Sequence, residues 1–122
     1  RSSSESMKDY VTKTVSSAMA MVGMKVITSG DYFGWNPNPN SPMVALMSKI
    51  YKDLFNQDPI VQVCHAGLEC SVILGKYPGL DIVSFGPTIR SPHTAGERAH
   101  IPSVTKFWQF LVKTLEEIPV KE

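Results

Sequence analysis

The sequence predicts an α/β fold in which a parallel β-α-β unit is flanked by amphipathic helices. Apolar residues recur every three or four positions in three segments, and two short apolar runs enclose a fourth, shorter helical segment. The composition agrees, because 43% of the 122 residues are hydrophobic and 19% are charged. We therefore expect a folded core of ordinary domain size rather than a disordered or fibrous chain.

The first 30 residues predict one helix followed by one strand. Serines before Glu5 offer helix caps, and the apolar residues that follow repeat at helical spacing, which predicts a helix over residues 4–22. β-branched residues before the turn signal at Gly30 predict a short strand over residues 24–28. Core filling is the expected role of the methionines in this part, Met7, Met19, Met21 and Met24.

Residues 31–41 have the composition of a linker. Residues 32–42 contain three asparagines and three of the nine prolines, which propagate neither a helix nor a strand ladder. Packing rather than ligand stacking is expected for the aromatic cluster in this segment, Tyr32, Phe33 and Trp35.

Two further helices are predicted from periodicity and capping. Ser41 caps a helix over residues 42–56, with a proline at its first position. Ser103 is expected to cap the last helix, which Pro119 ends. Its inward-facing residues are expected to be Val104, Phe107, Trp108, Leu111, Val112 and Leu115.

The parallel unit is predicted between these two helices. Residues 60–64 and 81–85 are short apolar runs typical of strands covered on both faces, and residues 67–75 predict a short helix between them. Such a crossover makes the strands parallel and places both carboxyl ends at one edge of the sheet.

Charge and composition exclude several classes of protein. Twelve Lys and Arg against eleven Asp and Glu give a net charge of +1 without long charged runs, so nucleic acid is not an expected partner. The apolar stretches are much shorter than the roughly 20 residues of a membrane span. Cys64 and Cys70 are expected to be reduced thiols in the cytoplasm. Because the chain opens with Arg1, we expect it to be an excised piece of a longer protein.

Two histidines follow the predicted strands of the parallel unit. His65 comes directly after residues 60–64, and His93 lies in the proline-stiffened connection after residues 81–85. In open α/β sheets ligands bind beyond the carboxyl ends of strands, and a neutral imidazole can ligate zinc. Position alone favours a surface histidine without a role at His93, and the zinc-ligand interpretation stays open beside it at this point.

The residues around His65 have similar alternatives. Gly67 and Glu69 begin the short helix, where free backbone amides attract anionic or carbonyl groups. The simpler interpretation is a core histidine and a glutamate that complements the helix dipole. Cys64 beside His65 suggests a thiol nucleophile, but neighbours on a strand point to opposite faces, which disfavours it. Cys70 is expected to be a small core residue. Structural or solvated roles are expected for His100 and Asp31.

Several separate motifs occur in one order along nearly the whole chain. They include HAGLEC at residues 65–70, SFGPTIR at residues 84–90, PH at residues 92–93 and ER at residues 97–98. In this order they resemble the aminoacyl-histidine dipeptidases, the cytosolic Xaa-His or non-specific dipeptidases. These are zinc peptidases with two co-catalytic metals, and the resemblance implies that this chain is the C-terminal portion of such an enzyme.

The resemblance also implies a division of the chain. Residues 1–30 would be the last helix and strand of an α+β lid and dimerisation domain. Residues 31–41 would be the hinge, and residues 42–122 would form the C-terminal part of the α/β catalytic domain. A dipeptide substrate, a homodimer formed through the lid and a cytoplasmic location follow from the same resemblance.

Three residues match functional positions of the family. His93 matches the last zinc ligand, Gly67 a glycine whose backbone contacts the substrate, and Arg1 the lid arginine that clamps the substrate's terminal carboxylate. The other zinc ligands and the catalytic glutamate are expected upstream of Arg1. Since one histidine cannot build a zinc site, the isolated chain is expected to be inactive.

The sequence departs from the family near His93. Ser71 and Ser91 stand where glycine is usual, and residues 94–96 are Thr-Ala-Gly instead of Ser-Pro-Asp. These departures bear on substrate preference more than on metal binding. The alternative function is a non-catalytic α/β binding or dimerisation module, in which residues 4–28 associate with a partner.

Overall fold

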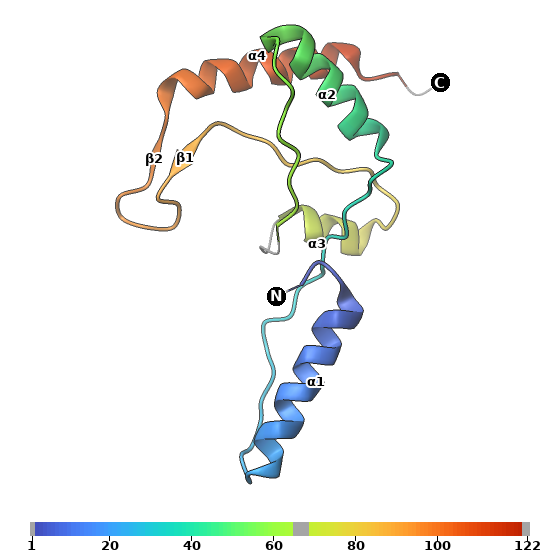
Figure 1. The fold of residues 1–122 in the computed structure, drawn as a ribbon, viewed down its shortest axis with the longest axis vertical. Coiled ribbons are helices and arrows are strands. Elements are labelled where there is room, and N and C mark those ends of the chain that lie inside the picture. Colours follow the sequence, from blue (N-terminus) through green and yellow to red (C-terminus); the bar gives the residue numbers. More distant parts are fainter. Residues whose placement is uncertain (1, 65–68, 121–122) are drawn as a thin grey trace. The chain divides into compact units, whose positions relative to one another are not determined.

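The chain forms helices and a small antiparallel ladder in a computed structural model that describes residues 2–64 and 69–120 (Figure 1). The elements in chain order are α1 (Glu5–Met21), α2 (Pro42–Phe55), α3 (Glu69–Lys76), β1 (Ile89–Arg90), β2 (Arg98–Ala99) and α4 (Ile101–Glu117). They fall into two compact units, Arg1–Pro39 with Val61–Ile82, and Asn40–Ile60 with Val83–Glu122.

The first unit contains α1, whose predicted extent is confirmed within one residue at each end. The segment after α1 runs back along the helix (Figure 1). Polar contacts join the two: Lys8 Nζ lies 2.8 Å from Asp31 Oδ1, and the Gly34 N–H donates to the Glu5 carboxylate. The first turn of α1 therefore fixes the start of the segment that was expected to be a linker.

No residue of α1 is buried within the described part of the chain. Its exposed apolar side chains are Met7, Tyr10, Val11, Val15, Met19 and Met21. The prediction that the methionines fill a core is therefore wrong for this structure, and Met24 is exposed as well. The physical reason is that an amphipathic stripe is buried only when another element covers it.

The second unit has its core between α2 and α4. Met47, Ile50 and Phe110 are buried there, and Phe55 and Val83 pack against them. Apolar burial of this kind, amounting to about 1.5–3 kcal/mol for each fully buried side chain, holds the two helices together. The rings of Phe85 and Phe107 extend the cluster, with centroids 5.4 Å apart.

The start of α2 agrees with the prediction, whereas the start of α4 does not. Ser41 Oγ accepts a hydrogen bond of 3.0 Å from the Val44 N–H, as an N-cap does. The last helix begins at Ile101 with His100 as its N-cap, so the prediction that Ser103 caps it is wrong. A proline in the first turn, which needs no N–H partner, allows this earlier start.

The inward face predicted for α4 is only partly correct. Phe110 and Thr114 are its buried residues. Trp108 and Leu115 are 62% and 63% exposed, and Val104 and Val112 are also exposed. In a chain of two small units, α4 is covered on the side of α2, and part of its apolar surface lies outside that contact.

None of the three predicted strands is formed in the described residues. Residues 24–28, 60–64 and 81–85 carry no ladder, and the only described sheet is the antiparallel pair of β1 and β2. A strand is stabilised by the ladder that a neighbouring strand supplies, so β propensity alone does not form one. The short helix between the last two segments is present as α3, with Gly75 lying against the Phe33 ring.

Candidate functional site

His93 lies in the connection of a β-hairpin. Ile89 pairs with Ala99 and Arg90 with Arg98, and residues 91–97 join the two strands. The hairpin is also tied to α4 at its base. The His100 N–H donates to the Thr88 carbonyl at 2.9 Å, and the Thr88 N–H donates to Ser103 Oγ at the same distance. These bonds fix the position of the loop that carries His93 relative to α4.

The backbone of this loop adopts two left-handed conformations. Ser91 has a φ of 51° and His93 a φ of 63°. Serine at position 91 thus occupies a conformation that glycine adopts without steric cost. The His93 N–H donates to Glu97 Oε2 at 2.7 Å, so a charged side chain of the same loop holds this backbone.

The described residues do not form a complete zinc site. His93 is exposed, and an imidazole on a fixed loop suits one zinc ligand. Within residues 2–64 and 69–120, however, no group of three His, Cys, Asp or Glu side chains is placed to hold a metal ion. His93 therefore fits the part of a single ligand, and the remaining ligands have no counterpart in the described part of this chain.

The other candidates occupy separate places. Glu69 is the exposed first residue of α3, where a carboxylate complements the helix dipole. Cys64 is exposed and Cys70 is half-buried, and both are free cysteines. His100 is the N-cap residue of α4, where its backbone rather than its side chain makes the hydrogen bonds, and Asp31 is in an ion pair with Lys8. Arg1, His65 and Gly67 lie outside the described residues.

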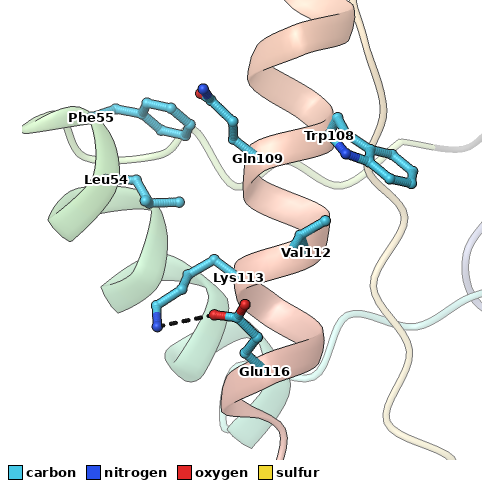
Figure 2. A pocket seen from close by; sticks show the side chains of 7 residues that line it. All are labelled: Leu54, Phe55, Trp108, Gln109, Val112, Lys113 and Glu116. Atoms are coloured by element: carbon cyan, nitrogen blue, oxygen red, sulfur yellow. Dashed lines mark hydrogen bonds and ion pairs between the residues drawn. The ribbon is translucent and has the colours of Figure 1, made fainter.

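An open groove of about 510 Å³ lies along α2 and α4. Figure 2 shows the side chains that line it, Leu54 and Phe55 from α2 and Trp108, Gln109, Val112, Lys113 and Glu116 from α4. Lys113 Nζ is 2.8 Å from Glu117 Oε1 and 3.3 Å from Glu116 Oε2. The hydrogen bond that Lys113 donates to Glu117, followed by the one it donates to Glu116, raises the pKa of Lys113, so this amine stays charged.

Two features of the second unit were not predicted from the sequence. The groove along α2 and α4 depends on how two helices pack, although both apolar faces were recognised. The bond from the His93 N–H to Glu97 depends on the left-handed backbone at His93. The sequence signal for this bond was the spacing of four residues between His93 and Glu97, but such a spacing predicts a contact only in a helix or a known turn.

Comparison with known proteins gives two similar dipeptidases. The chain is 45% identical over 121 residues to the cytosol non-specific dipeptidase of Escherichia coli (strain K12), covering 99% of this chain and 25% of that protein. The crystal structure of aminoacylhistidine dipeptidase from Vibrio alginolyticus matches with a TM-score of 0.82 at 37% identity, over 98% of this chain and 24% of that one. No family model matches the sequence.

These comparisons confirm the resemblance predicted from the motifs. The chain is similar to part of a dipeptidase, and it spans about a quarter of the length of each relative. The predicted α/β class is also confirmed, since the chain matches a dipeptidase structure over nearly its whole length, whereas the parallel strands of the predicted β-α-β unit are not formed in the described residues. Within the described residues, no helix has the length and apolar character needed to cross a membrane.

Proposed function

We propose that this chain is the C-terminal portion of a zinc-dependent dipeptidase that hydrolyses Xaa-His and other dipeptides. The observation that carries the proposal is the similarity to a cytosol non-specific dipeptidase, at 45% identity over 99% of the chain. A structural observation also supports the proposal, because His93 lies on a hydrogen-bonded hairpin loop.

In this proposal His93 supplies one zinc ligand through its imidazole, Gly67 contacts the substrate through its backbone, and Arg1 binds the terminal carboxylate of the dipeptide. A guanidinium matches a carboxylate because its two N–H groups donate in parallel. Zinc, when bound, supplies polarisation of the peptide carbonyl and a more acidic water molecule. The task of this chain is then to hold one ligand and to orient the substrate.

The same proposal assigns the parts of the chain. Residues 1–30 end a lid and dimerisation domain, residues 31–41 form the hinge, and residues 42–122 complete the catalytic domain. The protein acts as a homodimer in the cytoplasm, with dipeptides as substrates and without nucleic acid or membrane partners. Because the described residues offer one zinc ligand, the isolated chain is inactive.

The test compares two histidine variants in the longer protein that contains this chain. His93→Ala should lower dipeptide hydrolysis by at least about a hundredfold and reduce the zinc content, because a ligand is removed. His100→Ala is the matched control, since the His100 side chain makes no capping hydrogen bond at α4. Equal activity and equal zinc content in the two variants would contradict the proposal.

One observation favours the alternative of a binding or dimerisation module. The apolar residues of α1 are exposed, as they would be on a surface that associates with a partner. For such a module, His93→Ala would leave partner binding unchanged, and no zinc would be found in the wild-type protein. The same pair of variants therefore separates the two functions.

A further inference from the structure

The loop that carries His93 holds an uncommon backbone conformation. Ser91 and His93 both have positive φ, and neither is a glycine. For residues with a Cβ, the left-handed region is unfavourable, although histidine tolerates it better than branched residues do. A loop with two such residues keeps this conformation only where other interactions hold it.

Hydrogen bonds within the loop supply those interactions. Thr94 Oγ1 donates to the Ser91 carbonyl at 2.8 Å, and the Glu97 N–H donates to the Thr94 carbonyl at 3.1 Å. The bond of 2.7 Å from the His93 N–H to Glu97 Oε2 is the one that acts on His93 itself. It is also charge-assisted, which makes it stronger than a bond between neutral groups.

The Glu97 carboxylate accepts its hydrogen bond from the backbone of His93. Of the ion pairs among the described residues, none involves Glu97, although Arg98 is its neighbour in the sequence. The carboxylate instead accepts from a backbone N–H across the loop. This partner indicates that Glu97 stabilises the conformation of the loop rather than forming an ion pair with Arg98.

We propose that Glu97 is a positioning residue for the His93 imidazole. By accepting the His93 N–H, its carboxylate fixes the backbone from which the imidazole projects, and so fixes the direction of the His93 Cα–Cβ bond. The inference rests on the proposed function for the role of His93 as a zinc ligand. A ligand held in one orientation binds metal without the entropy cost of ordering the loop.

The first experiment measures the backbone bond in the 122-residue chain. Amide hydrogen exchange at His93 is compared in the wild type, Glu97→Ala, Glu97→Gln and the control Glu116→Ala, which removes an exposed carboxylate from α4. Glu97→Ala should speed exchange by about tenfold or more, because the bond is lost. Glu97→Gln keeps a carbonyl acceptor and should stay close to the wild type. Unchanged exchange in Glu97→Ala would overturn the proposal.

The second experiment measures bound zinc in the longer protein that contains this chain. Glu97→Ala should lower zinc affinity by about 10- to 100-fold, Glu97→Gln should restore most of it, and Glu116→Ala should not change it. Equal zinc affinity in Glu97→Ala and the wild type would overturn the positioning role and leave the proposed function intact. A wild-type protein that binds no zinc would overturn both.

Discussion

Lys8 Nζ lies 2.8 Å from Asp31 Oδ1, which joins the first turn of α1 to the segment that follows Gly30. The Lys8 side chain is only 18% exposed, and it also donates to the Tyr32 carbonyl. The hydrogen bond from Lys8 lowers the pKa of the Asp31 carboxyl below its ordinary value of 3.8, and burial opposes this shift. The stability of the first unit should therefore depend on pH through this ion pair.

The pH dependence of stability tests this link. Because the pKa of Asp31 is lowered by folding, its contribution is present above about pH 3.8 and is lost as the pH falls through the folded-state value. We expect Asp31→Asn to be less stable than the wild type near pH 6 and to lose less stability on acidification to about pH 2. Urea unfolding followed by circular dichroism measures both. Parallel pH profiles for the two proteins would rule out the contribution.

A second prediction concerns Gly34. A Cβ added there would collide with the backbone of Ser3, which cannot move as a flexible side chain can. We expect Gly34→Ala to destabilise the first unit by about 1–3 kcal/mol. Gly86→Ala is the matched control, because a Cβ there meets no atom within 4 Å. Similar melting temperatures for the two variants would show that Ser3 does not pack on Gly34.

A third prediction concerns the core of the second unit. The Phe110 ring is buried, and its centroid lies 5.4 Å from that of Tyr51 and 5.2 Å from that of Phe85. Phe110→Ala should cost about 3–5 kcal/mol, because it removes the ring and leaves a cavity. Ile60→Ala, at a position that is 85% exposed, should change stability by less than about 0.5 kcal/mol. Near-ultraviolet circular dichroism during urea unfolding reports on this aromatic cluster.

A fourth prediction concerns the isolated chain. With added zinc, the purified 122 residues should not hydrolyse Xaa-His dipeptides, because His93 alone does not make a metal site. The assay compares product formation with and without a chelator. Chelator-sensitive hydrolysis by this chain would show that it contains a complete active site.

The helices were predictable because their signals are local. The spacing of apolar residues and the Ser41 cap lie within a few positions of the elements they define, and α1 and α2 begin and end within one residue of expectation. The predicted start of α4 is wrong because Pro102 favours the first turn of a helix, which places Ser103 inside that turn rather than before it. Ser103 instead accepts from Thr88 and donates to the His100 carbonyl.

The strands were not predictable in the same way. Residues 24–28 have the composition of a strand, but a ladder requires a partner distant in the sequence, and none forms in the described residues. The hydrogen bonds around His93 were not predictable for a similar reason, because they depend on the folded backbone. His93 was found from its place in the chain and from the resemblance, whereas its bond to Glu97 follows from the local φ values, which the residue types did not indicate.

The most direct measurement of the central claim is the coding sequence upstream of Arg1. We predict that the reading frame continues for several hundred codons and encodes a His-x-Asp pair and an adjacent pair of acidic residues, which would be the further zinc ligands. A start codon immediately before Arg1, with no such residues encoded, would contradict the account and leave the binding module as the better explanation.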